Sequence, residues 1–517
     1  SSEKALSGPG TLRERVRCFS ITLAPNVTAA TGMPQPRYWH TGVSVVDINS
    51  DGLLDIYVCS VSQYKSLQGR NLLLICDSID RNSVPHYSEQ ALQYGIGFSG
   101  FSTQAAFIDY DRDNDLDLFL LNHSVNHDGN YAPRENFLNT YDSLAGHRLY
   151  RNDFKKNKDG SASAFFTDVT RESGIHSSRI GYGLGVAVAD IDLDGWQDIY
   201  VGNDFHENDY LYINDQHGAF KESLTTYFSS ISMGSMGADF ADLDNDGLNE
   251  LFVTEMLPDS LNRKQTKIIY ENWNKYQLNV ANGYHHQFAR NVLQKAVSNG
   301  HYVEIGRMAN VAATEWSWGA LLFDMDNDGL RDIFVANGIR KDLLDRDYLS
   351  YTGSEENIRR LLRKEGSAIL KLIDLMPASA YKNYAFHNTG NLNFKNEAKN
   401  WGLDHSMYSN GSAYADFDND GDLDLVINNL DGPSVIYQNK SENSRHKFIS
   451  IELAQSGDNS GAIGTKAVIF QGTRQYSVDN FITRGYQSAV TSRILVGLGS
   501  DSSQIDSISF FRPQGGS

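Results

Sequence analysis

Acidic residues recur at one fixed spacing in six places along this 517-residue chain. In the stretch from Asp416 to Asp424, oxygen-bearing side chains stand at positions 1, 3, 5 and 9, and Gly421 stands at position 6. Alternating carboxylates on a tight turn can converge on one hard cation, and Ca²⁺ takes about six to eight oxygen ligands. Glycine at position 6 allows the left-handed backbone conformation that such a turn requires. The stretch therefore predicts a calcium-binding loop.

The other five stretches keep this spacing, and in each of them the backbone carbonyl of position 7 would complete the cage. From position 1 to position 9, the predicted calcium ligands are Asp47, Asn49, Asp51, Leu53 and Asp55 in the first loop; Asp109, Asp111, Asp113, Asp115 and Asp117 in the second; Asp190, Asp192, Asp194, Trp196 and Asp198 in the third; Asp242, Asp244, Asp246, Leu248 and Glu250 in the fourth; Asp324, Asp326, Asp328, Leu330 and Asp332 in the fifth; and Asp416, Asp418, Asp420, Asp422 and Asp424 in the sixth. In the second loop Asn114 takes the place of the glycine, and Asn also tolerates a left-handed conformation. Six matches favour about six bound Ca²⁺ ions over solvated acidic turns without metal.

The residues around the loops exclude the EF-hand, which needs a bidentate Glu at position 12 and a helix on each side. Position 12 is apolar in every copy: Val58, Leu120, Val201, Val253, Val335 and Ile427. Short runs rich in Val, Ile, Phe and Tyr flank the loops, such as residues 42–46 and 56–58 around the first. Such runs are typical of strands. Each unit is therefore predicted to be a strand, a calcium loop and a second strand.

The spacing of the units predicts an all-β fold built from repeats. The first positions of successive loops lie 52 to 92 residues apart, and the shortest step is near the size of one four-stranded propeller blade. Such blades cannot bury their faces alone and must pack around a ring. We therefore predict a calcium-loop β-propeller with six visible blades over residues 39–445, followed by a small β-domain over residues 446–517. Residues 1–38 form an N-terminal segment, in which residues 17–22 could supply a ring-closing strand.

Three insertions interrupt the repeat, at residues 123–147, 256–290 and 342–382. Each begins just past the second strand of a unit, so we expect all three on the rim opposite the calcium loops, where they would form a binding surface. Trp273, Tyr276 and Tyr284 are the first candidates for ligand contact, because aromatic faces with polar edges suit sugars or protein side chains. The alternative is that these aromatic residues form a small core beneath the insertion.

Charge and composition limit the partners. The formal net charge is −19, much of it supplied by the six loops, which argues against nucleic acid as a partner. No apolar run is long enough to span a membrane. Three cysteines make no disulfide framework. The N-terminus shows no apolar signal core, so we expect either that a signal or a lipid-anchored leader has been removed or that the chain is a fragment.

The loops and the C-terminal motifs together resemble a known family. The loops resemble FG-GAP (VCBS-type) repeats, as in the integrin α-chain propeller. The last 70 or so residues resemble the ASPIC/UnbV domain, and the matching stretches are residues 461–464, 484–488, 497–499 and 511–515. From about residue 39 onward the chain is similar to the secreted, cartilage-acidic-protein-like proteins of Bacteroidetes.

The resemblance implies an exported, calcium-binding, non-catalytic β-propeller at the extracellular or outer-membrane surface. Members of the family usually have seven blades, whereas residues 1–38 contain no calcium loop and the C-terminal domain ends just after a strand. These departures predict a chain that lacks the first blade and the end of its last domain.

No catalytic constellation is evident, so the first hypothesis is a binding or adhesion module for a glycan or a protein. The alternatives are a calcium-dependent polysaccharide lyase and a structural subunit of an export or uptake complex. Basic and aromatic residues in one pocket with a calcium site would favour the lyase. Aromatic residues that lie away from closed calcium sites would favour binding.

Overall fold

The computed structural model describes the chain from residue 28 to residue 513, with gaps. The described residues are 28–34, 38–126, 132–153, 155–156, 162–163, 166–267, 272–297, 300–357, 368–378, 380–444, 446–500 and 504–513. Strands form most of the regular structure, which confirms the predicted all-β class. The predicted strand at residues 17–22 lies outside the described residues.

Six antiparallel sheets repeat along the chain, and in each of them a predicted calcium loop joins the first two strands. In chain order the strands are β1 (Trp39–Val46), β2 (Asp55–Val61), β3 (Leu72–Ile79) and β4 (Pro85–Glu89) in the first sheet; β5 (Ser102–Ile108), β6 (Asp117–Asn122), β7 (Arg148–Asn152) and β10 (Phe166–Asp168) in the second; β11 (Gly183–Ala189), β12 (Asp198–Asn203), β13 (Tyr210–Asn214) and β14 (Phe220–Glu222) in the third; β16 (Ala238–Ala241), β17 (Glu250–Val253), β19 (Val292–Val297) and β20 (His301–Glu304) in the fourth; β21 (Ser317–Phe323), β22 (Asp332–Asn337), β24 (Tyr384–Asn388) and β25 (Phe394–Asn396) in the fifth; and β27 (Ser409–Ala415), β28 (Asp424–Asn429) and β29 (Val435–Tyr437) in the sixth.

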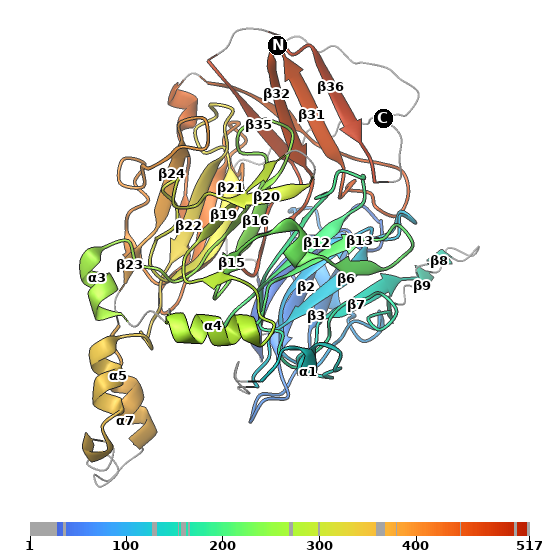
Figure 1. Ribbon diagram of the computed structural model, residues 1–517. Helices are drawn as coiled ribbons and strands as arrows, with labels where there is room; N and C mark the ends of the chain where they lie inside the picture. Colours follow the sequence, from blue (N-terminus) through green and yellow to red (C-terminus); the bar gives the residue numbers. More distant parts are fainter. Residues whose placement is uncertain are drawn as a thin grey trace.

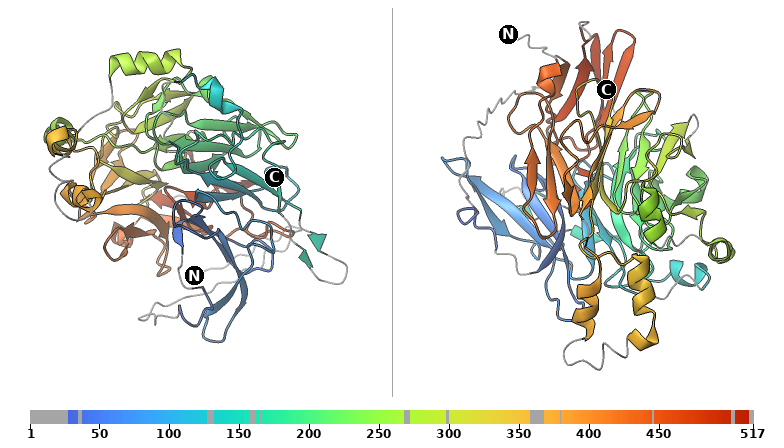
Figure 2. Two further views of the ribbon diagram at one scale, coloured as in Figure 1. Left: turned by 90° about the horizontal axis from the view of Figure 1, so that it is seen from below. Right: turned by 90° about the vertical axis from the view of Figure 1, so that its left-hand side faces the viewer.

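The sheets stand side by side through their first strands. β1 contacts β5, β5 contacts β11, β11 contacts β16, β16 contacts β21, and β21 contacts β27. Figure 2 shows the sheets arranged around a common axis in the view from below. This arrangement fits the predicted propeller. Strands such as β5 and β11 are buried along their whole length, because neighbouring sheets cover both of their faces.

The first and sixth sheets are less completely covered. β27 is mostly half-buried, and Ile436 on β29 is 67% exposed. Beside the first sheet, the Tyr87 N–H donates to the Thr31 carbonyl at 2.8 Å. The same contact recurs between neighbouring sheets. The Phe166 N–H of the second sheet donates to the Tyr94 carbonyl just after the first sheet, and the Phe220 N–H of the third sheet donates to the Ser173 carbonyl just after the second. Residues 28–33 therefore contact the fourth strand of the first sheet in the way that the residues after one sheet contact the fourth strand of the next sheet.

The insertions carry most of the helices. The helices are α1 (Glu135–Leu138), α2 (Leu224–Tyr227), α3 (Leu261–Thr266), α4 (Trp273–Ala281), α5 (Arg346–Thr352) and α7 (Ala368–Leu375), and residues 441–444 form a 3₁₀ turn. The short strands that lie outside the six sheets, before the C-terminal domain, are β8 (Lys155–Lys156), β9 (Ala162–Ser163), β15 (Ile231–Ser232), β18 (Gln287–Phe288), β23 (Tyr381–Lys382) and β26 (Ser406–Met407). In Figure 1 the helices α1, α4, α5 and α7 lie in the lower half of the molecule, and α3 lies at its left edge above α5. The described parts of the three insertions therefore gather on one rim.

The C-terminal residues form small sheets at the opposite end of the molecule (Figure 1). β30 (Lys447–Ile451) pairs with β35 (Ile494–Gly499), and β31 (Lys466–Gln471) lies between β32 (Arg474–Asp479) and β36 (Ser507–Phe511). This domain sits on the loop-bearing end of the sheets. Gly499 N–H donates to the Asn327 carbonyl of the fifth loop at 3.0 Å, and Asn249 of the fourth loop donates to Asp479 at 2.6 Å.

One part of the C-terminal domain leaves it and enters the axis between the sheets. This axial hairpin, residues 483–489, comprises β33 (Thr483–Arg484) and β34 (Ser488–Ala489) and contacts β1, β5, β11, β16 and β27. Gly485 pairs with Ala238 of β16 through the backbone, with its N–H 3.1 Å from the Ala238 carbonyl. The Gln104 side chain bonds Gln487 N–H at 3.0 Å and the Ser488 carbonyl at 3.1 Å. The sequence predicted a small β-domain here, but not a segment on the axis.

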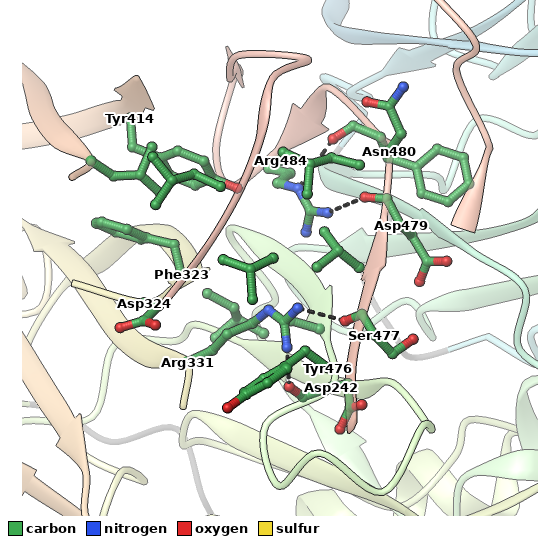
Figure 3. A pocket seen from close by; sticks show the side chains of 18 of the residues that line it. Asp242, Phe323, Asp324, Arg331, Tyr414, Tyr476, Ser477, Asp479, Asn480 and Arg484 are labelled. Atoms are coloured by element: carbon green, nitrogen blue, oxygen red, sulfur yellow. Dashed lines mark hydrogen bonds between the residues drawn. The ribbon is translucent and has the colours of Figure 1, made fainter. Parts of the chain in front are cut away.

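Arginines hold this junction together. The buried Arg484 guanidinium forms an ion pair with Asp239 at 2.7 Å and donates to the Phe240 carbonyl at 2.7 Å. Figure 3 shows Arg484 and Arg331 pointing into the space between the C-terminal domain and the sheets, where Arg331 donates to the carbonyls of Asp242 and Ser477. Burial raises the pKa of the Asp239 carboxyl, and Arg484 offsets part of that rise.

Replacement of Arg484 by Ala should lower the free energy of unfolding by about 3–5 kcal/mol, because Asp239 would stay buried without its charge partner. Urea unfolding followed by tryptophan fluorescence measures this loss. The control is Arg493→Ala, which removes only a hydrogen bond to exposed Asn419 and should change stability by less than about 0.5 kcal/mol. Equal losses in the two variants would contradict the assigned role of Arg484.

Candidate calcium loops and an aromatic cleft

The six loops share one backbone geometry. Position 4 is left-handed in every loop, with φ between 56° and 63°: Ser50, Arg112, Leu193, Asn245, Asn327 and Asn419. Position 6 is also left-handed, with φ between 78° and 94°: Gly52, Asn114, Gly195, Gly247, Gly329 and Gly421. Asn114, in the place of the glycine, has φ of 78°. Two left-handed residues turn the chain tightly enough for alternate side chains to face one point.

Hydrogen bonds to the backbone fix the carboxylates in this turn. In every loop the position-1 carboxylate accepts the N–H of position 6, as in Asp324 with Gly329 at 2.9 Å. The position-5 carboxylate accepts the N–H of position 7, as in Asp328 with Leu330 at 2.8 Å. Each bond engages one oxygen and leaves other lone pairs for a cation.

The position-9 side chain anchors each loop to its sheet. It is buried in all six loops, and one of its oxygens accepts the N–H of position 2. In five loops the other oxygen accepts a further backbone N–H, as in Asp198 with Asn214 at 2.8 Å. The donor lies in the third strand, except in the sixth loop, where Asn439 lies two residues beyond β29. The sequence predicted these residues as calcium ligands, and the structure adds this anchoring role.

Asparagines at the ends of third strands also belong to the site, although the sequence argument gave them no role. The Asn214 amide donates to the carbonyl of Tyr110 in the second loop at 2.8 Å. Asn388 in the same way reaches the carbonyl of Leu243 in the fourth loop at 2.7 Å. Each amide therefore ties its own sheet to the loop of the preceding sheet. Their repetition in the sequence was the signal that could have identified them.

Crowding and burial make the loop carboxylates costly to ionise without a cation. Burial raises the pKa of Asp55 to about 7 and of Asp190 and Asp242 to about 6, with smaller contributions from neighbouring acids. A divalent cation would remove this cost. Among the described residues, three carboxylates of one loop each offer an oxygen within 4.8 Å of the others in the second to fifth loops: Asp109, Asp111 and Asp117; Asp190, Asp192 and Asp194; Asp242, Asp244 and Asp246; and Asp324, Asp326 and Asp328.

Buried oxygens without a partner give a further test of the fit. Among the described residues, Asp190 Oδ1 and Asp416 Oδ1, both at position 1 of a loop, are buried and accept no hydrogen bond. Native proteins seldom leave such atoms unsatisfied. Short carboxylates that converge with free lone pairs are the donor set that Ca²⁺ takes. The residues present therefore fit calcium.

The aromatic candidates lie on the insertion rim, but only two of the three are placed to meet a ligand. Trp273, at the start of α4, is 68% exposed, and its ring stacks on Tyr276 with centroids 5.4 Å apart. The Tyr276 ring also stacks on His286, and its hydroxyl hydrogen-bonds His286 Nδ1 at 2.7 Å. Tyr284, by contrast, is only 3% exposed and packs edge-on against His206. Its predicted place on a binding surface is wrong, because this part of the insertion packs against residues 206–208, between β12 and β13.

Trp273 and Tyr276 line a cleft of about 310 Å³, which also includes Asn272, Lys275 and Gln287. We call this cleft and its neighbour the rim clefts. Asn272 caps the N-terminus of α4 by accepting two backbone N–H groups, which fixes the helix and its rings. The side chains of the cleft therefore combine flat aromatic faces with amide and ammonium hydrogen-bonding groups.

The neighbouring cleft is larger, about 410 Å³, and shares Met233, Lys275 and Asn279 with the first. The buried Lys267 lines it, with its ammonium 5.0 Å from the Trp316 ring. Burial lowers the pKa of Lys267 and raises that of Asp204 in the same cleft to about 6. None of the predicted calcium ligands lines either rim cleft. Basic and aromatic residues thus meet away from the loops.

Two family models match parts of this chain. The FG-GAP-like repeat matches residues 190–253 and 371–427, and the ASPIC and UnbV model matches residues 455–515. Cartilage acidic protein 1 of Mus musculus and that of Homo sapiens are each 26% identical over 324 residues, which is 56% of this chain. The match covers 47% and 46% of these relatives, so the chain spans about half the length of the curated proteins it matches.

Solved structures show weaker likeness. An Agrocybe aegerita lectin, described as recognising non-reducing terminal N-acetylglucosamine, aligns with a TM-score of 0.36 and 11% identity over 78% of this chain and 81% of the lectin. A fructofuranosidase from Schwanniomyces occidentalis aligns with a TM-score of 0.32 and 9% identity over 95% of this chain and 83% of the enzyme.

In the described part of the chain, no helix has the length and apolar character needed to cross a bilayer. The matched models agree with the resemblance seen in the sequence. The chain thus carries FG-GAP-like repeats followed by an ASPIC and UnbV domain, and it is a distant relative of cartilage acidic protein 1.

Proposed function

We propose that this protein is an exported, calcium-stabilised binding module that presents the rim clefts to a glycan at the cell surface. The observation that carries the proposal is the separation of two sites at opposite ends of the sheets. Loops suited to calcium lie at one end, under the C-terminal domain, and exposed aromatic rings lie at the other. The repeat and domain matches, and the likeness to cartilage acidic protein 1, support an exported protein.

Calcium has a structural role in this proposal. The loop ligands are anchored to strands and, through Asn214 and Asn388, to neighbouring loops. A cation bound in one loop therefore stabilises two sheets. Binding to the folded state alone adds stability by mass action, about 2.7 kcal/mol for each site at a concentration 100 times its Kd.

A sugar is the ligand that the rim clefts suit best. The exposed face of Trp273 can stack on the apolar face of a pyranose ring, while the Asn272 amide and the Lys275 ammonium can donate to hydroxyl groups. The polysaccharide lyase is less well supported, because no predicted calcium ligand lines the clefts to neutralise an acidic sugar. No observation favours a role in an export complex.

Calcium should raise the thermal stability of the protein. We expect the midpoint of thermal unfolding to be higher in excess Ca²⁺ than in EDTA, because empty loops hold repelling buried carboxylates. Circular dichroism melts at fixed ionic strength measure the difference, and Mg²⁺ at the same concentration serves as the control. The calcium role would be wrong if the midpoints in Ca²⁺ and EDTA coincide.

Trp273→Ala should weaken glycan binding about tenfold, because stacking on an exposed aromatic ring is worth about 0.5–1.5 kcal/mol beyond the area it buries. Titration calorimetry with a polysaccharide that binds the wild type, chosen from a panel of neutral and acidic polymers, gives the affinity. Trp39→Ala is the matched control, since Trp39 is 63% exposed but does not line the clefts.

The calcium-dependent melt of both tryptophan variants should match that of the wild type. Equal affinities for the Trp273 and Trp39 variants would remove the rim clefts as the site. Absence of binding to every polymer in the panel would count against a glycan ligand.

A further inference from the structure

The fourth loop contains a positively charged side chain of its own. The ammonium of Lys295, on β19, lies 2.5 Å from Asp244 Oδ2, 3.3 Å from Asp246 Oδ2 and 3.7 Å from Glu250 Oε1. These are the predicted ligands at positions 3, 5 and 9 of the loop. One side chain from the third strand thus faces three of the carboxylates on which a calcium ion would depend.

Strand register shows how this position is filled in the other sheets. The backbone pairing of the second and third strands begins at position 10 of each loop. Continued by one residue, this register places a third-strand residue, or in the sixth sheet the residue just after β29, opposite position 9 with its side chain on the same face. From the first sheet to the sixth, these residues are Ile75, Arg151, Ile213, Lys295, His387 and Gln438. The position is therefore variable, and two loops have an isoleucine there that offers no charge.

The other polar residues at this position are engaged differently. Arg151 pairs with Asp153 at 2.9 Å, outside the second loop. Gln438 donates to Asp418 at 2.6 Å but carries no charge. His387 contacts two carboxylates of the fifth loop, at 3.3 and 3.8 Å. An imidazole has a ring nitrogen that can bind a cation, whereas the ammonium group of a lysine has only donors.

Position 9 of the fourth loop also differs from the rest. It is the glutamate Glu250, whereas the other five loops have aspartate. Glu250 Oε2 keeps the bond to the position-2 N–H, at 2.9 Å from Leu243 N. Its Oε1 is buried and accepts no hydrogen bond, although the equivalent oxygen in the other five loops accepts a backbone N–H. The ammonium of Lys295 is the positive charge that faces this oxygen.

We propose that Lys295 is the resident cation of the fourth loop, so that this loop holds its carboxylates together without calcium. Ca²⁺ can enter only if it displaces an ammonium group that already donates to Asp244 and Asp246. This inference rests on the proposed function, in which the other loops bind calcium. Calcium stoichiometry is then set by the third-strand residue as well as by the acidic motif.

A fourth loop that does not depend on calcium would affect the C-terminal domain, which rests on it. It supports the C-terminal domain, because Lys466 donates to the Gly247 carbonyl at 3.1 Å and Asn249 donates to Asp479 at 2.6 Å. The Arg331 side chain joins the Asp242 carbonyl to Ser477 of β32. With Lys295 in the loop, this part of the contact surface keeps its shape when calcium is scarce.

Removal of the lysine should create a calcium site. Lys295→Ile introduces the residue that the first and third sheets have at this position, and it should increase bound calcium by one ion per chain. Equilibrium dialysis with metal analysis, at about 0.1–1 mM free Ca²⁺, gives the count. Ile213→Lys makes the reverse change in the third loop and should remove one ion. Near-ultraviolet circular dichroism verifies that both variants are folded.

Alanine substitutions in two loops separate this inference from the proposed function, and they leave Lys295 in place. Asp192→Ala in the third loop should remove one bound ion, whereas Asp244→Ala in the fourth should leave the count of the wild type unchanged. Loss of one ion in Asp244→Ala, or an unchanged count in Lys295→Ile, would overturn the role of Lys295. An unchanged count in Asp192→Ala would show that the third loop does not bind calcium, and a wild-type chain with no bound calcium would overturn the proposed function.

Discussion

Carboxylates that crowd together out of water are the constraint on which this structure depends. All six position-9 side chains are buried, as are the position-1 side chains Asp47, Asp109, Asp242 and Asp324. An ionised carboxylate is costly to bury unless it is paired or hydrogen-bonded. Backbone N–H groups at positions 2, 6 and 7 satisfy part of each loop, and the remaining lone pairs converge where a cation fits. The fold is thus organised around negative charge that it cannot fully neutralise with its own hydrogen bonds.

Hydrogen bonds connect the buried carboxylates of each loop to the rest of the molecule. Position 9 joins a loop to its own third strand, and the third-strand asparagines join it to the preceding sheet. The C-terminal domain contacts the loop residues Asn249 and Arg331, and its own Arg484 forms an ion pair with Asp239 on the axis. Because loops, sheets and axial hairpin share these bonds, order in one loop favours order in its neighbours.

The sequence was most informative where the chemistry is local. Loop ligands stand within nine residues of one another, so their spacing alone predicts a turn, and the left-handed Asn114 is what such a turn needs. The axial hairpin could not be predicted in this way, because Arg484 and Gln487 meet Asp239 and Gln104, residues hundreds of positions away along the chain. Burial of Tyr284 also depends on how the insertion folds back on the third sheet, for which the sequence has no periodic signal. The place of Lys295 in a loop can be read from the sequence only once the register of β17 and β19 is known.

The loop end of the sheets and the insertion rim differ in how well they can tolerate substitutions. At the loop end, side chains such as Asn388, Asn249 and Arg331 join a loop to a neighbouring sheet or to the C-terminal domain, so substitutions there disturb contacts between parts of the molecule. At the opposite rim, the insertions need only cover the ends of the sheets, and Trp273 and Tyr276 rest on α4, which has its own cap at Asn272. A ligand surface built on such insertions can alter its residues with little effect on the stability of the sheets. The proposed binding surface and the loop carboxylates on which stability depends therefore lie at opposite ends of the molecule, so a change at one end need not disturb the other.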